Sequence, residues 1–128
     1  MEYKDNVRYQ DSHEWARIEG DVAVIGISDY AQDSLGDVVF VEFPDLGKNL
    51  TKGQAFGVVE SVKAASDVFM PMTGEIIEIN VLLKDNPEKI NQDPFGDGWI
   101  MKVKISQPDE YDTLMSAADY QEYVKGLD

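Results

Sequence analysis

The chain has 128 residues, of which 43% are hydrophobic, and its 25 acidic and 11 basic residues give a net charge of −14. This length and apolar content are typical of one globular domain, which we expect to span residues 1–128. The negative charge disfavours nucleic acid and anionic membranes as partners, and the absence of cysteine excludes disulfides, thiolate catalysis and zinc–thiolate sites.

The sequence lacks the features of membrane insertion and of protein export. No run of about 18 apolar residues is present, so we expect no membrane-spanning helix. The first five residues, MEYKD, form neither an apolar signal core nor an arginine-rich transit pattern. We therefore expect a cytoplasmic, bacterial location, or the mitochondrial matrix if a transit peptide has been removed.

The first three-quarters of the chain predict short β-strands separated by turns. Alternating or β-branched apolar runs, bounded by Gly, Pro, Asn and Asp, indicate such strands. We expect them over residues 14–18, 22–27, 38–43, 54–61, 66–70, 75–80 and 99–105. The run at 22–27 contains four β-branched residues and does not alternate, which is typical of a strand buried on both faces.

A short helix is predicted between the second and third of these strands. Ser28 or Asp29 can cap its N-terminus, and the helix is expected to end at Leu35. Gly36 then occupies the position where a glycine commonly follows a helix. By contrast, residues 84–98 are rich in Asn, Asp, Pro and Gly, so we expect most of this segment to be loop.

The last quarter of the chain changes to a helical period, with helices expected over about residues 108–127. Pro108 is suited to a first helical turn, and Ser116 followed by Asp119 resembles a capping box. The residues expected on the first helical face are Tyr111, Leu114 and Met115. Many short strands with helices at the end of the chain indicate a small, mainly β barrel or sandwich.

Lys63 is the strongest candidate for attachment chemistry because it lies at the predicted tip of the hairpin formed by residues 54–61 and 66–70. Its neighbours are Val62, Ala64 and Ala65. This low bulk leaves the amine accessible to a modifying enzyme, and Glu60 and Asp67 can orient an attached group or a ligase. A solvated lysine at a strand turn shows the same pattern, so the residues alone leave both interpretations open.

Several separate motifs resemble those of the glycine cleavage H-protein family. The attachment-like stretch is FGVVESVKAASD at residues 56–67. The other matching stretches are SHEW at 12–15, IGISDYAQ at 25–32, LGDVVFV at 35–41, DNP at 85–87, NQDPFGDGW at 91–99 and the helical segment 108–123. Together they span about residues 7–124 in family order.

This resemblance implies the fold and the cofactor. The family's fold is a barrel-sandwich hybrid, lipoyl-domain-like, of two antiparallel sheets with short helices and a helical C-terminus. Lys63 would carry lipoate in amide linkage as a swinging arm, so the protein would be a non-catalytic carrier whose cofactor supplies the chemistry.

The resemblance also implies the partners of a glycine catabolic, one-carbon system. The carrier would shuttle an aminomethyl group from a pyridoxal-phosphate glycine decarboxylase to a tetrahydrofolate-dependent aminomethyltransferase. A dihydrolipoyl dehydrogenase would reoxidise the arm, and a lipoate ligase or lipoyl transferase would attach it. We expect a monomer, because one arm must visit several enzymes.

Two further sets of residues follow from the resemblance. The positions that match the pocket for the loaded arm are Ser12, Glu14 and Asp67. The positions that match the motif read by the attaching enzyme are Glu60, Ser61 and Ala64. From the sequence alone, the three pocket residues look like ordinary surface polar residues, with Glu14 on the polar face of a strand.

Other functions fit the sequence poorly. His13 is the only histidine and no Gly-x-Ser-x-Gly motif is present, which argues against a hydrolase and favours a structural or surface histidine. Residues 93–98 superficially resemble a calcium loop, but Phe95 and Lys104 occupy ligand positions. A biotinyl domain would have methionines beside the lysine. An H-like lipoyl relay or a scaffold protein remains the alternative function.

Overall fold

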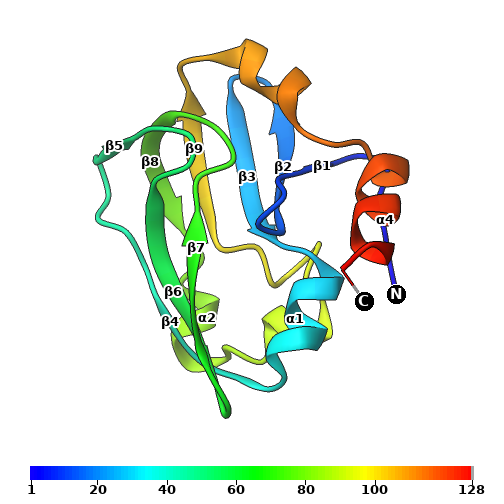
Figure 1. Ribbon diagram of the computed structural model, residues 1–128. Coiled ribbons are helices and arrows are strands. Elements are labelled where there is room, and N and C mark those ends of the chain that lie inside the picture. Colours follow the sequence, from blue (N-terminus) through cyan, green and yellow to red (C-terminus); the bar gives the residue numbers. More distant parts are fainter. Residues whose placement is uncertain (128) are drawn as a thin grey trace.

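The computed structural model describes residues 1–127, which form nine strands and five helical segments (Figure 1). The strands are β1 (Arg8–Tyr9), β2 (Glu14–Glu19), β3 (Val22–Ile27), β4 (Val38–Glu42), β5 (Asn49–Leu50), β6 (Ala55–Ser61), β7 (Ala65–Phe69), β8 (Gly74–Ile79) and β9 (Met101–Ile105). The helices are α1 (Asp29–Leu35), α2 (Leu82–Asp85), α3 (Lys89–Gln92), the 3₁₀ helix η1 (Pro108–Thr113) and α4 (Ala117–Lys125).

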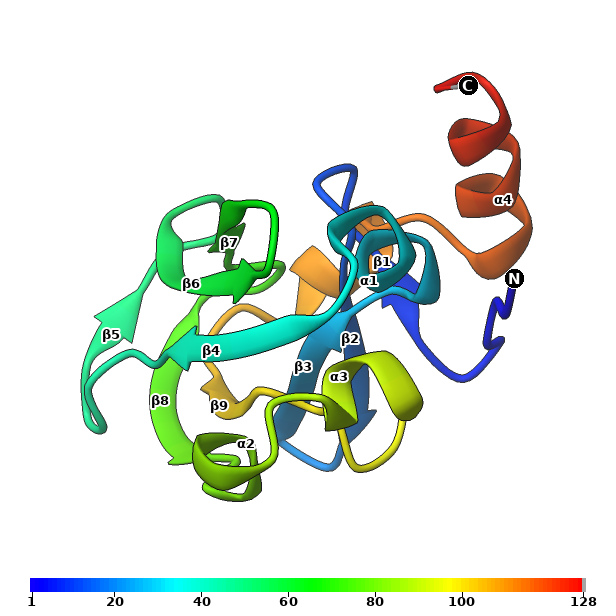
Figure 2. The ribbon, with the colours of Figure 1, turned by 90° about the horizontal axis from the view of Figure 1, so that it is seen from below.

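The strands form two antiparallel sheets, as the resemblance to the family implies. The larger sheet has the order β1-β2-β3-β9-β8-β5, and the smaller has the order β4-β6-β7. Figure 2 shows the smaller sheet stacked on one side of the larger one, with α1 and α3 beside it. Every strand pair is antiparallel, so the mainly β fold of two antiparallel sheets is confirmed.

The main hydrophobic core lies between the two sheets. The smaller sheet contributes Val38, Val41, Phe56, Val59 and Val68. The larger sheet contributes Ala16, Ala23, Ile25, Ile27, Ile76, Met101 and Val103. Each large apolar side chain that leaves water here stabilises the fold by roughly 1.5–3 kcal/mol. The hairpin of β6 and β7 is therefore fixed at its base by packing.

A second cluster lies on the outer face of the larger sheet, under α4. Its largest members are Tyr9, Trp15, Phe95 and Tyr120, and the Tyr9 and Tyr120 rings stack with centroids 4.3 Å apart. Strand β3 lies between the two clusters, because Val24 packs in the outer cluster while the neighbouring Ile25 packs in the main core. Burial on both faces explains its non-alternating run of residues.

Most of the segment at residues 84–98 lies outside helices and strands, as predicted. It also contains the whole of α3 and the C-terminal end of α2, which are both short helices of four residues. Asn80 fixes the fold around these helices, since its amide donates to the carbonyls of Asp97 (2.8 Å) and Trp99 (2.7 Å). Leu83 and Ile90 anchor the helices in the core. These contacts are long-range, so local composition did not indicate them.

The predicted helical face of Tyr111, Leu114 and Met115 is wrong. The 3₁₀ helix ends at Thr113 and Leu114 is extended (ψ 155°), so Met115 instead forms a β-bridge with Tyr9. Two backbone hydrogen bonds of 2.8 and 2.9 Å join this pair and turn the chain toward α4. The cap of α4 is confirmed, because the Ser116 hydroxyl accepts a hydrogen bond from the Asp119 amide.

Within residues 1–127, no helix has the length and apolar character needed to cross a lipid bilayer.

Candidate functional site

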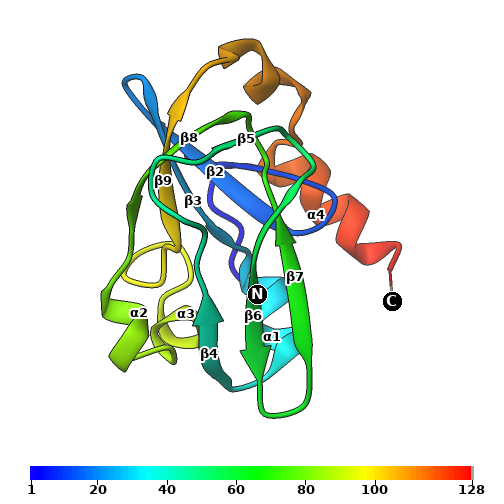
Figure 3. The same ribbon diagram turned by 90° about the vertical axis from the view of Figure 1, so that its left-hand side faces the viewer.

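The hairpin of β6 and β7 carries Lys63 at its tip and projects beyond the rest of the molecule (Figure 3). The turn closes through the Ser61 amide, which donates to the Ala64 carbonyl at 2.7 Å. The Ser61 hydroxyl in turn accepts from the amides of Lys63 (3.3 Å) and Ala64 (3.1 Å). Lys63 is exposed, so its amine is accessible on a backbone that is held in place.

A backbone hydrogen bond helps to fasten this tip to the rest of the protein. The Val62 amide donates to the Asp37 carbonyl at 3.0 Å, in the segment that follows α1. The neighbouring Gly36 has φ 80°, a left-handed conformation that glycine adopts without strain. A Cβ built on Gly36 would lie 3.6 Å from Lys63 Cε, so the lysine side chain passes over the C-terminal end of α1.

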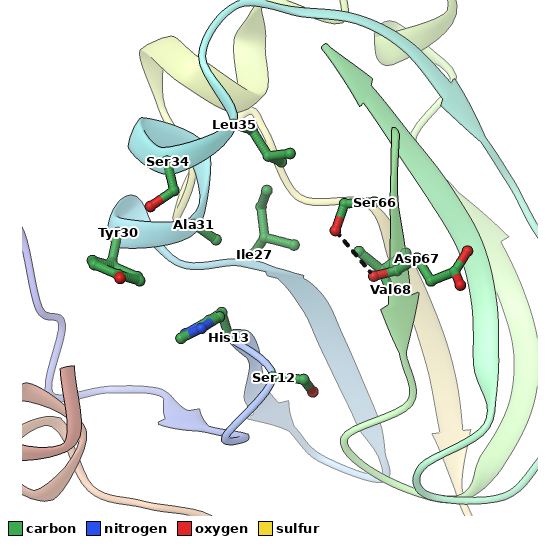
Figure 4. A pocket seen from close by; sticks show the side chains of 10 residues that line it. All are labelled: Ser12, His13, Ile27, Tyr30, Ala31, Ser34, Leu35, Ser66, Asp67 and Val68. Atoms are coloured by element: carbon green, nitrogen blue, oxygen red, sulfur yellow. Dashed lines mark hydrogen bonds between the residues drawn. The ribbon is translucent and has the colours of Figure 1, made fainter. Parts of the chain in front are cut away.

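A cleft of about 260 Å³ lies beside α1 (Figure 4). Its apolar lining consists of Ile27, Ala31, Leu35 and Val68. Its polar lining consists of Ser12, His13, Tyr30, Ser34, Ser66 and Asp67. Residues of α1 form one wall and β7 forms the opposite wall, while Ser12 and His13 lie at one end. The helix thus lines the cleft, and the glycine that ends it lies beside the Lys63 side chain.

The three predicted pocket residues occupy three different places. Ser12 lines the cleft directly. Asp67 contributes to its wall, but its carboxylate points away, because Ser66 and Val68 face inward on the alternating strand (Figure 4). Glu14 is absent from the lining and is only 1% exposed. The structure therefore brings Ser12 and Glu14 together and turns the carboxylate of Asp67 outward.

Glu14 lies next to the cleft residue Ser12 in a site made of hydrogen-bond donors. Its Oε1 accepts from the Ser12 hydroxyl and from the Gln10 amide (3.0 Å), and its Oε2 accepts from the Phe69 amide at 2.9 Å. Burial raises the pKa of Glu14, and the hydrogen bonds from Ser12, Gln10 and Phe69 oppose that rise. The sequence predicts Glu14 on the solvent-facing, polar face of a strand, and that prediction is wrong because the side chain is buried.

His13 lines the cleft and is held in a left-handed conformation with φ 85°. Its Nδ1 lies 2.7 Å from the hydroxyl of Tyr120, which lies 2.7 Å from the hydroxyl of Ser28, the cap of α1. Burial lowers the pKa of His13 and so favours the neutral ring. The sequence predicts only a structural or surface role for His13, although its position beside Ser12 is a signal for the cleft.

The predicted recognition residues all lie on the hairpin. Glu60 is half-buried on β6 opposite Ala65, Ser61 closes the turn, and Ala64 is exposed. Among residues 1–127, no group of three or more His, Asp or Glu side chains is placed to hold a metal ion. The exposed side chain of Lys63 places an accessible amine at the tip of this hairpin.

Comparisons with known proteins give a consistent result. The family model described as "Glycine cleavage H-protein" matches residues 7–127. The glycine cleavage system H protein of Acaryochloris marina is 48% identical over 126 residues, which is 98% of each chain. That of Xanthobacter autotrophicus is 53% identical over 122 residues, covering 95% of this chain and 98% of the relative.

A solved structure agrees with these sequence matches. The crystal structure of a glycine cleavage system H protein from Mycobacterium marinum superposes with a TM-score of 0.84 at 34% sequence identity. The match covers 96% of this chain and 97% of that chain.

Proposed function

The chain belongs to the glycine cleavage H-protein family, and from this membership we propose that Lys63 is its lipoyl attachment residue. The protein is a non-catalytic lipoyl carrier of the glycine cleavage system, and it shuttles an aminomethyl group. When bound, the lipoyl group supplies a disulfide that accepts and releases this group. The observation that supports Lys63 most strongly is its exposure at the tip of a projecting, hydrogen-bonded hairpin.

The residues present fit a lipoyl group. The amine of Lys63 is accessible for amide formation, and its stem passes over Gly36 at the end of α1. From there the cleft offers an aliphatic lining of Ile27, Ala31 and Leu35 along the same side of the molecule. An aliphatic arm is stabilised by burial against such a surface, which also excludes water from it.

In our proposal, the polar environment of the cleft depends on three residues with different roles: Ser12, Glu14 and Asp67. The aminomethyl cargo carries an ammonium group, which needs acceptor oxygens near the arm. The Ser12 hydroxyl donates to Glu14, so the remaining lone pairs of Ser12 are available to the cargo. The Asp67 carboxylate, outside the cleft wall, adds negative charge at its rim. Glu60, Ser61 and Ala64 present the attachment motif to the attaching enzyme.

The partners follow from membership of this system. We propose that the carrier's partners are a pyridoxal-phosphate glycine decarboxylase, a tetrahydrofolate-dependent aminomethyltransferase and a dihydrolipoyl dehydrogenase. The modifying enzyme is a lipoate ligase or a lipoyl transferase. The net charge of −14 favours basic docking faces on these enzymes. We also propose that the chain folds as one carrier domain, because β2 and β3 contribute to both hydrophobic clusters. We propose a monomer, because one arm must visit several enzymes.

The test is the intact mass of protein made in a lipoate-replete host with an active ligase, followed by peptide mapping. We expect a mass increase of one lipoyl group in the parent protein and none in the Lys63→Ala variant. The matched control is Lys48→Ala, which removes an exposed lysine elsewhere and retains the modification. Modification at another lysine, or none under conditions that lipoylate a known carrier, would refute the assignment.

A second measurement separates glycine cleavage from a lipoyl relay. The lipoylated protein is combined with the decarboxylase and labelled glycine, and release of carbon dioxide is recorded. We expect release that depends on the lipoylated carrier and is absent with Lys63→Ala. A lipoylated protein that supports no release would contradict a role in glycine cleavage while leaving the attachment site intact.

A further inference from the structure

A hydrogen-bond chain runs behind Glu14, on the side away from the cleft. Lys52 donates from Nζ to Gln10 Oε1 at 3.2 Å, and Gln10 donates from Nε2 to Glu14 Oε1 at 3.0 Å. A second donation from Lys52, to the Pro71 carbonyl at 3.2 Å, fixes the position of the ammonium. Gln10 is 8% exposed and Lys52 is half-buried, so the middle of this chain of hydrogen bonds lies largely within the protein.

The chemistry of Lys52 fixes which way Gln10 faces. An ammonium group can only donate hydrogen bonds, so the amide oxygen of Gln10 must face Lys52. The NH₂ of Gln10 must then face Glu14. The groups that contact the Glu14 side chain are consequently the amide hydrogens of Gln10 and Phe69 and the hydroxyl of Ser12.

This donor set distinguishes the two protonation states of Glu14. A carboxylate accepts all three hydrogen bonds. A protonated Glu14 needs an acceptor. Ser12 can provide one by turning its own hydroxyl hydrogen away, whereas Gln10 can provide one only if its amide rotates, which the bond to Lys52 opposes. The ion pairs found within residues 1–127 do not include Glu14. The negative charge therefore depends on these oriented donors, because burial alone favours the neutral acid.

The state of Glu14 sets the direction of the Ser12 hydroxyl at the cleft. When Glu14 is a carboxylate, Ser12 donates its hydrogen inward and presents lone pairs to the cleft, as a cargo ammonium requires. When Glu14 is protonated and donates to Ser12, the hydroxyl hydrogen turns toward the cleft and meets the ammonium hydrogens.

We propose that Lys52 and Gln10 are positioning residues that keep Glu14 a carboxylate, and thereby keep Ser12 an acceptor for the ammonium of the cargo. The inference rests on the proposed function for its cargo, but its first step concerns only residues of this chain. Lys52, Gln10, Glu14 and Ser12 then act as one unit that sets the polarity of the cleft.

The first experiment measures the pKa of Glu14 in protein without lipoate, by ¹³C-carboxyl NMR titration. In Lys52→Met the amide of Gln10 is free to rotate, and we expect about a tenfold shift of the protonation equilibrium toward the acid. Lys52→Arg also only donates and should retain the parent value. Lys48→Met makes the same charge change on an exposed lysine and serves as the control. Amide spectra verify that each variant is folded.

An unchanged Glu14 pKa in Lys52→Met, or an equal change in Lys48→Met, overturns the proposal. If the pKa does rise, the second measurement is the half-life of the lipoylated protein after loading with the aminomethyl group. We expect it to fall severalfold in Lys52→Met and to be restored in Lys52→Arg. A raised pKa with an unchanged half-life overturns the link to the cargo. Failure of Lys63 to accept lipoate would refute the proposed function without affecting the titration.

Discussion

The turn at residues 61–65 and the segment at residues 10–15 both belong to the functional region, yet they are stabilised differently. In the turn, the hydroxyl of Ser61 bonds to residues two and three positions away. In the other segment, Glu14 bonds to Phe69, 55 positions away, and His13 contacts Tyr120, 107 positions away. The turn is exposed, whereas Glu14 and Trp15 are buried.

This difference matches two different chemical tasks. A modifying enzyme needs an accessible amine, which a locally closed turn supplies without help from the core. Control of protonation needs low exposure and fixed donors, which come from several strands and helices. Substitutions should therefore have small effects on stability in the turn and large effects in residues 10–15.

The largest expected difference compares Trp15→Ala with Val62→Ala. Trp15 is fully buried and its indole donates to the carbonyls of Ile27 (2.9 Å) and Pro94 (3.2 Å), so truncation should lower the free energy of unfolding by about 3–5 kcal/mol. Val62 is 70% exposed, and its truncation should change that free energy by less than ~0.5 kcal/mol. Urea denaturation measures both, and comparable losses would contradict the contrast.

A smaller effect is expected when one hydroxyl is removed from the buried network. Tyr120→Phe takes a partner from both His13 and Ser28, so we expect a loss of about 1–2 kcal/mol in the free energy of unfolding. The matched control is Tyr123→Phe, whose exposed hydroxyl donates to the Asp11 carbonyl at 3.0 Å. Equal losses in the two variants would show that the network adds nothing beyond a surface hydrogen bond.

The smallest expected effect concerns the pH dependence of folding stability, to which the adjacent residues His13 and Glu14 contribute in opposite directions. The pKa of His13 is lowered, so the unfolded chain takes up the proton first, and stability falls as pH drops below about 6.5. The pKa of Glu14 is raised above 4.5, so the unfolded chain loses its proton first, and stability falls as pH rises through the folded pKa.

These slopes are measured as differences in unfolding free energy between the parent and each variant from pH 4 to pH 8. The advantage of the parent over His13→Asn should shrink toward acid, and its advantage over Glu14→Gln should shrink as pH rises from 4.5. Asn is chosen because it tolerates the left-handed backbone of His13. Slopes of the same sign would contradict the assigned shifts.

Features that depend on neighbouring residues were predictable from the sequence. Strand β3 at Val22–Ile27 has the predicted bounds, because its β-branched run and flanking turns are local signals. The same holds for α1, whose cap Ser28 and terminal Gly36 lie where expected. The alternation of β7 also determines that Ser66 and Val68 share a face opposite Asp67, a pattern that could have indicated the outward carboxylate.

Features that depend on distant residues were not predictable. The helices α2 and α3 rely on Asn80 and on burial in the core, not on composition. The burial of Glu14 requires Gln10 and Phe69 to meet, which only the folded sheets bring about. The resemblance of its surroundings to the family is what indicates Lys63, because an exposed lysine at a turn has no local chemical property that sets it apart from other surface lysines.

The hydrogen bond from Val62 to Asp37 has a consequence for any group attached to Lys63. It gives the tether a fixed origin beside one wall of the cleft. The local concentration of the attached group at the cleft is then set by tether length and is independent of how much protein is in solution. Weak contacts are therefore enough to hold the attached group in the cleft. A partner enzyme that removes the group must compete with this local concentration, which is the same in dilute and in crowded solution.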